Sequence, residues 1–351
     1  RDLRMSRGLG DVYKRQITWL IHQKFELSIP LYRQEKEWEA LGLRLSRATM
    51  SNWLLIVYRD WLVHIVHRLK LELLKQRYLH IDETHVQVLK EPGRKNTSDS
   101  YMWVYCSIRD AVNPIRYFEY QPGRSGKYPE AFLREYEGYI HTDAYSGYNA
   151  VSGVKRCLCY THLRRAFVDA LPKDIHNSEA SKPAEAILRL NQLFNIESEL
   201  EALPPDQKKK ERLIREKPLL EAFWSWAEKS AIGELPKSKL SKAFHYALNN
   251  REGFWNYLED GNCSISNSLA ENCIRPFVIG RKNWLFSGSP KGAEASAGIY
   301  TLVETAKANG LAPMKYIKYI LSDMPGSAFL EHPEYLDDYL PWNPLVKEFC
   351  R

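Results

Sequence analysis

The sequence predicts an α/β protein in which a strand-rich segment is flanked by helical segments. Within residues 78–170, the run 78–89 alternates apolar and polar side chains, which is typical of a strand with one buried face, and further short runs are rich in aromatic residues. The segments before and after place their apolar residues at helical spacing. With 351 residues, 44% of them hydrophobic, the chain has the composition of a globular protein and can bury one large core or two smaller ones.

Charge and cysteine content narrow the class of protein. No run of about 18 apolar residues and no apolar signal segment is present, so we expect a cytoplasmic protein without membrane contact. The six cysteines are sparse and form no disulfide-scaffold pattern, so we expect reduced thiols. A net charge of +7 suits a polyanionic partner but is small enough to be incidental.

The chain is expected to begin with a short tail and a helical region. Residues 1–16 are mostly polar and basic without apolar periodicity, so we interpret them as a disordered or non-native tail. Residues 17–77 are expected to be helical. Within them, residues 31–41 predict one helix, Gly42 ends it in a left-handed conformation, and Ser46 caps a second helix.

This hairpin has helix-turn-helix spacing. One interpretation is a DNA-contacting hairpin, and the other is an αα-hairpin that only packs on the main domain, which the sequence alone slightly favours. A long helix from about Trp53 to Lys75 is expected to lead into the core.

Residues 78–170 are expected to form the first part of the core. The predicted strands are 78–89, 101–108, 115–120, 139–143 and 156–159, with a helix at about 129–137. Short polar turns join the first three strands, which predicts an antiparallel meander.

Helices are expected to take over after this segment. Residues 171–250 are rich in Glu, Lys, Leu and Arg and predict a helical insertion. Residues 251–325 are expected to complete the core with helices at 293–308 and 313–321, and without further strands. Residues 326–351 contain several prolines and predict a loosely docked C-terminal tail.

Three acidic residues are candidates for chemistry. Asp82 lies in a predicted strand whose other face is apolar, Asp143 ends another strand, and Glu271 stands among apolar residues at helical spacing. Carboxylates about 4 Å apart repel by roughly 4 kcal/mol at an effective dielectric of about 20, so a cluster of three requires a cation or a proton. Mg²⁺ prefers such oxygen ligands. The alternative, that each acid is an exposed or capping residue, is favoured for any one of them by residue type alone.

Longer motifs favour the metal-binding interpretation of the three acids over the alternative of exposed or capping residues. They are Asp82-Glu83-Thr84, the segment 138–149, the segment 159–165 and the segment 279–286. With these motifs, the chain from Pro30 to Trp342 resembles the insertion sequence 66 family of bacterial DDE transposases, of the catalytic-subunit type.

The resemblance implies an RNase H-like mixed sheet of three antiparallel strands plus parallel strands, flanked by helices. It also implies that Asp82, Asp143 and Glu271 bind two Mg²⁺ or Mn²⁺ ions, with the helical insertion between the second and third acids. The implied activity is cleavage at transposon ends and strand transfer by 3′-hydroxyl attack. The implied partners are transposon-end DNA, target DNA, further copies of the chain in a homo-oligomer, and small accessory proteins encoded by the element.

The chain departs from the family pattern at one place. The family usually shows paired asparagines followed by Glu-Arg, whereas this chain has Ser266-Asn267 and Glu271-Asn272. Together with its short start, this suggests an alternative, a catalytically impaired DNA-binding remnant. A third reading is a structure-specific nuclease that hydrolyses DNA without joining it.

A cysteine and histidine motif accompanies the acids. One interpretation is a zinc site formed by Cys157, Cys159 and His162. These residues offer three soft ligands without an evident fourth, whereas structural zinc is nearly always four-coordinate. We favour a hydrogen-bonding role for Cys159 and His162 beside the metals, which resembles the Cys-x-x-His element of related transposases.

Basic and aromatic residues are candidates for DNA contacts. Basic candidates for phosphate contacts are Arg124, Lys127, Arg164, Arg165, Arg275, Arg281 and Lys282. For each of them the alternative is a solvated surface charge. Trp284 and Phe286 are candidates for stacking on an unpaired base, although such a pair is more often part of a core.

Overall fold

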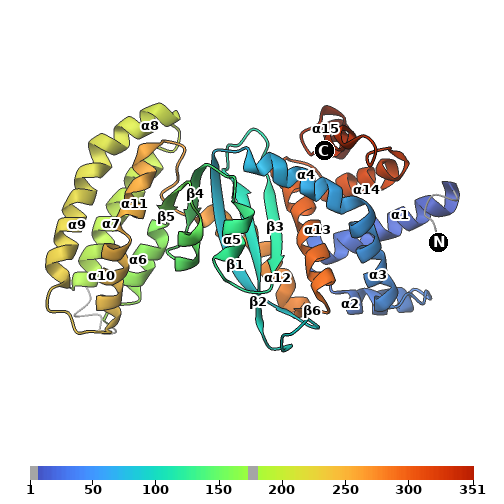
Figure 1. The fold of residues 1–351 in the computed structure, drawn as a ribbon, viewed down its shortest axis with the longest axis horizontal. Helices are drawn as coiled ribbons and strands as arrows, with labels where there is room; N and C mark the ends of the chain where they lie inside the picture. The colour runs from blue at the N-terminus through green and yellow to red at the C-terminus, as the bar shows by residue number, and fades with distance from the viewer. Residues whose placement is uncertain (1–6, 173–180) are drawn as a thin grey trace. The chain divides into compact units, whose positions relative to one another are not determined.

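The computed structural model describes residues 7–172 and 181–351, and it shows an α/β protein with one mixed sheet flanked by helices (Figure 1). The strand order is β3-β2-β1-β4-β5, and a short sixth strand pairs with β1. The predicted mixture of antiparallel and parallel strands with flanking helices is confirmed. Residues 1–6 of the predicted tail and residues 173–180 of the predicted insertion lie outside the described residues.

Two compact units make up the chain. The first consists of residues 1–76, 81–128 and 269–351, and the second of residues 77–80 and 129–268. Strand β1 (Tyr78–Val88) begins in the second unit and continues in the first.

The N-terminal helices of the first unit are α1 (Arg7–Ile21), η1 (His22–Glu26), α2 (Leu31–Ala40), α3 (Arg47–Val57), η2 (Tyr58–Leu62) and α4 (Val63–Leu74). The hairpin of α2 and α3 has the predicted caps. Gly42 has a φ of 81°, and Ser46 Oγ accepts a hydrogen bond of 3.1 Å from Thr49 N. The π-helical turn η2 continues α3 into α4, so one helical run replaces the two helices expected there.

The N-terminal segment differs from the tail that we expected. Helix α1 starts inside the segment 1–16 and contacts α3 and α14. Ile17, Leu20 and Ile21 are at most 3% exposed and anchor it. These contacts make α1 part of the first unit.

Strands β2 (Asp99–Ser107) and β3 (Arg116–Gln121) pair antiparallel, with Val104 opposite Phe118. The expectation that no strand follows residue 250 was wrong, because β6 (Phe286–Ser287) pairs in parallel with the end of β1, Gln87 opposite Phe286. Two residues are too few to show the alternation that identifies a strand in a sequence.

Helix α13 (Pro290–Ala308) covers β3, the edge strand of the sheet (Figure 1). Thr301 Oγ1 accepts a hydrogen bond of 2.8 Å from Phe118 N, and Thr305 Oγ1 accepts one of 3.1 Å from Arg116 N. These hydroxyls lie four residues apart on one helix face and satisfy backbone groups that an edge strand otherwise exposes.

The first unit ends with α14 (Pro313–Asp323), η7 (Met324–Gly326), η8 (Pro333–Tyr339) and α15 (Pro344–Cys350). This C-terminal segment is docked more closely than we expected. Val346 and Cys350 are fully buried, and Cys350 O accepts a hydrogen bond of 2.7 Å from Ala312 N.

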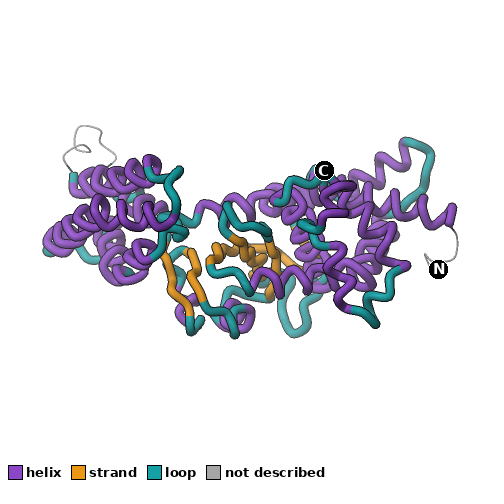
Figure 2. The backbone as a smooth tube through the Cα atoms, turned by 90° about the horizontal axis from the view of Figure 1, so that it is seen from above, coloured by secondary structure: helices purple, strands orange, loops and turns teal. Residues whose placement is uncertain are grey.

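The second unit combines two parallel strands with a group of helices, which Figures 1 and 2 show beside these strands. Its elements are β4 (Gly138–Thr142), η3 (Ser146–Ala150), β5 (Val154–Leu158), α6 (Tyr160–Val168), α7 (Lys182–Glu199), α8 (Pro205–Glu211), η5 (Arg212–Glu216), α9 (Lys217–Ala231), α10 (Lys239–Asn249), α11 (Arg251–Trp255) and η6 (Asn256–Glu259). Helix α5 (Lys127–Phe132) precedes β4 and ends five residues before the predicted end at residue 137.

One hydrophobic cluster joins these helices to the strands. It contains Tyr139 and Leu158 from the strands, together with Leu190, Phe223 and Phe244 from α7, α9 and α10. The helices of the segment 171–250 therefore share a core with β4 and β5.

Candidate active site

Asp82 lies on β1, where the strand passes from buried to partly exposed surroundings. Leu79 and Ile81 are fully buried, whereas Asp82 and the two residues after it are half-buried. Asp82 Oδ1 accepts a hydrogen bond of 2.9 Å from Glu83 N. Burial therefore changes along the strand at Asp82, from three buried residues to three half-buried ones, and the face to which Asp82 points stays a prediction.

Asp143 directly follows β4 and is half-buried. Its Oδ1 accepts a hydrogen bond of 3.0 Å from Tyr145 N, so the carboxylate is part of the turn that follows the strand. Its charge also adds to the effect of burial in raising the pKa of Tyr246 on α10. Asp143 is therefore near this helix of the second unit.

Arg156 of β5 holds the backbone around Asp143. Its Nη2 donates to Asp143 O at 2.6 Å and to Tyr145 O at 2.8 Å, and its Nε donates to Thr142 Oγ1 at 2.7 Å. Sequence reasoning missed Arg156. The available signal was its position in the strand-like segment that precedes Cys157.

Glu271 lies in the first turn of α12 (Ser268–Trp284) and is half-buried. A negative charge is favoured there, because the backbone N–H groups of the first turn point toward it. The helix contacts the sheet of the first unit at two places. Arg281 Nη1 donates to Thr84 Oγ1 of β1 at 3.1 Å, and the Cys273 thiol hydrogen-bonds that of Cys106 on β2.

These contacts relate two of the three predicted acids. Burial, then the bond to Cys273, and to a smaller extent the charge of Asp82, raise the pKa of Cys106. Asp82 and the α12 turn with Glu271 therefore both lie near Cys106 in the first unit. Asp143 belongs to the second unit, so the gathering of all three acids remains a prediction.

Cys159 and His162 lie at the start of α6 in the second unit. Cys159 is the N-cap residue, and its Sγ accepts a hydrogen bond of 3.1 Å from Asn267 N. His162 is half-buried, and its backbone N–H donates to Cys159 O at 3.2 Å. Cys157 is grouped with other residues, as described below.

Two buried histidines were missed by sequence reasoning. His80 and His141 face each other in the register of β1 and β4, and their rings stack with centroids 4.2 Å apart. His80 Nδ1 lies 3.0 Å from Asn267 Oδ1. His80 precedes Asp82 by two residues on β1, which places both on one strand face, and His141 likewise precedes Asp143, which directly follows β4; this spacing was the signal available.

Arg124, Arg164 and Arg281 make polar contacts within the protein. Arg124 pairs with Glu83, the residue after Asp82, through Nη2 and Oε1 at 2.6 Å. Arg164 Nε donates to Asn191 Oδ1 at 2.7 Å, and Arg281 contacts Thr84 as described above. Burial lowers the pKa of Arg281.

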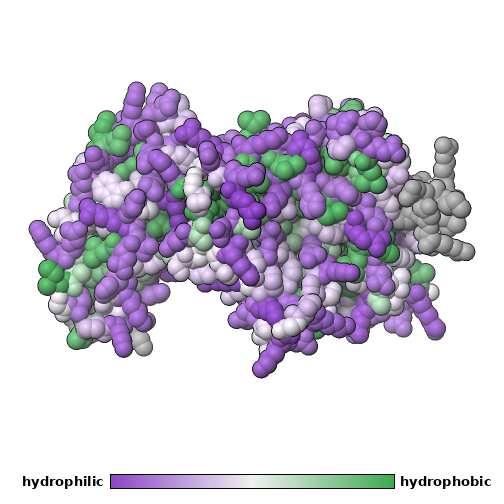
Figure 3. All heavy atoms as spheres, in the orientation of Figure 1, coloured by the Kyte–Doolittle hydropathy of each residue, from purple (hydrophilic) through white to green (hydrophobic). Residues whose placement is uncertain are grey.

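The other basic candidates are exposed, namely Lys127, Arg165, Arg275 and Lys282. Hydrophilic side chains cover most of the face shown in Figure 3, so exposure of a single cation does not identify a DNA contact. Their role in DNA binding remains a prediction.

Trp284 packs within the first unit. Its ring lies 5.4 Å from that of Phe277 in a T-shaped contact, and Lys24 Nζ lies 4.9 Å above it. Burial lowers the pKa of Lys24 to about 8. Phe286 is 46% exposed, so it is the better placed of the two aromatic candidates for contact with a base.

Half-buried acids lie on a strand, directly after a strand and in a first helical turn of this α/β chain. The model of the family described as "Transposase IS66 family" matches residues 12–295. The chain therefore belongs to the IS66 transposase family, as its motifs indicated.

Relatives of the chain occur in Sinorhizobium fredii. "Uncharacterized protein y4qI" is 28% identical, with 94% of this chain and 62% of the relative covered. "Uncharacterized protein y4hP" is 26% identical, with 92% and 60% covered. The chain thus spans about three fifths of the length of these relatives. No solved structure matches it. Among the described residues, no helix has the length and apolar character needed to cross a membrane.

Proposed function

We propose that this chain is a DNA transposase that cleaves at the ends of a mobile element and joins the freed 3′-hydroxyl to target DNA. The observation that carries the proposal is the family match over residues 12–295, which includes Asp82, Asp143 and Glu271. Transposon ends and target DNA are the proposed substrates. A homo-oligomer and small accessory proteins remain predicted partners.

We also propose the RNase H-like assignment for the sheet. The order β3-β2-β1-β4-β5 supports it, because β2 and β3 form a hairpin on one side of β1 while β4 and β5 run parallel to β1 on the other. Helices α7 to α10 lie between Asp143 and Glu271 in the chain, which supports the proposed insertion.

Asp82, Asp143 and Glu271 are the proposed ligands of two divalent ions, Mg²⁺ or Mn²⁺. They fit this role because their carboxylates are half-buried and supply the hard oxygen atoms that such ions prefer. When bound, two ions would activate the attacking hydroxyl and stabilise the leaving oxygen. Arg156 would orient Asp143 by donating to the carbonyls of Asp143 and Tyr145 and to the hydroxyl of Thr142.

The test is strand transfer by the 351-residue chain on DNA that carries the element's ends, with Mg²⁺ or Mn²⁺. Asp82→Asn, Asp143→Asn and Glu271→Gln should each lose several kcal/mol of transition-state stabilisation, or about 1000-fold in rate. Asp99→Asn is the matched control, because Asp99 is an exposed carboxylate at the start of β2 and should be dispensable.

Each outcome separates the proposals. Joining at the normal rate by Asp82→Asn would refute the site assignment. End binding without cleavage under Mn²⁺ would favour the impaired remnant, to which the exposed Asn272 beside Glu271 points. Hydrolysis without joining would favour a structure-specific nuclease.

A further inference from the structure

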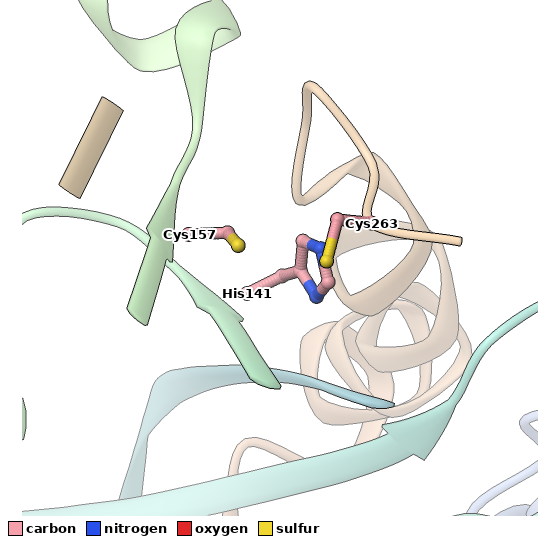
Figure 4. A group of neighbouring side chains, drawn as sticks. All are labelled: His141, Cys157 and Cys263. Atoms are coloured by element: carbon pink, nitrogen blue, oxygen red, sulfur yellow. The ribbon is translucent and has the colours of Figure 1, made fainter. Parts of the chain in front are cut away.

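His141, Cys157 and Cys263 form a buried group in the second unit (Figure 4). His141 comes from β4, Cys157 from β5 and Cys263 from the loop between η6 and α12. One ligand atom of each residue lies within 4.8 Å of those of the other two, and all three residues are at most 1% exposed. Both sulfur atoms point toward the imidazole ring in Figure 4.

The histidine is oriented as a metal ligand usually is. His141 Nδ1 lies 3.1 Å from Leu79 O, so this nitrogen carries the hydrogen and donates it to the carbonyl. That bond leaves the lone pair on Nε2. A backbone carbonyl that fixes the second ring nitrogen is a common support of a metal-binding imidazole.

The chemistry of the donors selects the kind of cation. Two sulfurs and one imidazole nitrogen suit a soft or borderline ion such as Zn²⁺ and do not suit Mg²⁺, which takes oxygen ligands. Three protein ligands leave one position of a tetrahedral Zn²⁺ ion for a ligand from outside the chain. Without the ion, Nε2 accepts a hydrogen bond of 2.9 Å from Ser264 N, so metal binding must displace this N–H.

We propose that His141, Cys157 and Cys263 bind one Zn²⁺ ion through three protein ligands, with the fourth position open, at a site separate from the predicted carboxylate site that ties β4 and β5 to the loop before α12. The site would fix the end of the strand that leads into Asp143. It differs from the set considered from the sequence, because Cys157 joins His141 and Cys263 while the Cys159 sulfur accepts a hydrogen bond from Asn267 N.

The experiment titrates the reduced, metal-free full chain with Co²⁺, whose thiolate complexes absorb in the near ultraviolet and visible. We expect one Co²⁺ per chain with thiolate-to-metal charge transfer, and its displacement by Zn²⁺. Cys157→Ser and Cys263→Ser should each abolish the charge-transfer band. Cys106→Ser should retain it, because Cys106 and Cys273 form a second thiol pair, in the first unit.

A wild-type chain without the charge-transfer band, or a band that persists in Cys263→Ser, would overturn the proposal. The wild-type titration decides even if a variant fails to fold. A second readout is thermal unfolding, since Zn²⁺ should raise the melting temperature of the wild type and of Cys106→Ser but not of Cys157→Ser. A disulfide between Cys157 and Cys263 in unreduced protein, with no metal binding after reduction, would assign the pair to redox chemistry instead.

Discussion

Replacing Arg212 by Met should strongly destabilise the second unit. Arg212 is fully buried in η5 and donates to Glu197 on α7, from Nε to Oε1 at 2.5 Å and from Nη2 to Oε2 at 2.8 Å. It also donates to three backbone carbonyls, those of Tyr257 at 3.0 Å, Asp260 at 3.1 Å and Cys263 at 2.8 Å. One side chain therefore connects two helical segments and the loop that carries Cys263.

The expected loss in the free energy of unfolding is about 4 kcal/mol. Removal of one partner from a buried ion pair costs about 3–5 kcal/mol, because the other charge stays buried without compensation. Each carbonyl that loses its donor adds about 1 kcal/mol if no water replaces it. Lys208 Nζ lies 3.2 Å from Glu197 Oε2 and still compensates part of the glutamate charge after the substitution. Because of this remaining ion pair, and because water can reach some of the carbonyls, we expect a loss near the middle of the range for the ion pair alone.

Urea unfolding followed by far-UV circular dichroism and tryptophan fluorescence measures this change. Arg215→Met is the matched control, because Arg215 lies three residues later in η5 and pairs with the exposed Glu199. We expect the control to unfold like the wild type. If the two units unfold in separate transitions, only one of them should shift.

A double variant tests the cause. Glu197→Met combined with Arg212→Met leaves no buried charge and should recover part of the loss. If Arg212→Met unfolded at the same urea concentration as Arg215→Met, or if the double variant were no more stable than Arg212→Met, the reasoning about the buried charge would be wrong.

Three further predictions concern pH, backbone contact and salt. Burial and, less strongly, the charge of Glu197 raise the pKa of Glu216 to about 8. This pKa exceeds the value of about 4.3 in the unfolded chain, so the folded state holds the proton of Glu216 more tightly. The resulting stabilisation is fully present below pH ~4 and is lost as the pH rises to ~8, and over this range the free energy of unfolding falls by at most about 1.4 kcal/mol per pH unit. Between pH 5 and 8, the urea midpoint of Glu216→Gln should therefore decline less steeply than that of the wild type. Equal slopes of the two midpoints against pH would contradict this prediction. Gly261→Ala should lower the melting temperature, because the new Cβ would stand 1.9 Å from Pro205 O, whereas Gly288→Ala, with open space around it, should not. Arg275→Ala should reduce the slope of log affinity for DNA against log salt by about 0.9 if this exposed side chain contacts a phosphate, and an unchanged slope would remove it from the interface.

Local chemistry made much of the fold predictable. The Ser46 cap, the left-handed Gly42 and the strand at β1 each depend on residues within a few positions, and the structure contains all three. The elements that differ from the prediction have only weak signals in the neighbouring sequence. A π-helical turn such as η2 contains no residue that breaks a helix, and the pairing of β6 depends on a distant strand.

The candidate site was only partly predictable for the same reason. The acids were found through long motifs. The distances between them in space could not be predicted, because the three acids lie on different elements. His80 and His141 occupy positions that alternation assigns only to a face, and their stacking depends on the register of two strands. Arg212 lies in a segment rich in Lys, Arg and Glu that resembles a solvated helix, yet it is buried, because Glu197 meets it from another helix.

The helices of the segment 171–250 hold the loop that carries Cys263. The sequence did not suggest this role, because none of the predicted site residues lies in that segment. Arg212 holds the carbonyls of Asp260 and Cys263, and the next residue, Ser264, donates its backbone N–H to His141 on β4. Because β4 leads directly into Asp143, hydrogen bonds and a strand connect the buried arginine to the second predicted acid. We therefore expect that a change in these helices can reduce strand transfer while DNA binding is kept, which separate measurements of the two activities in variants of this segment would test.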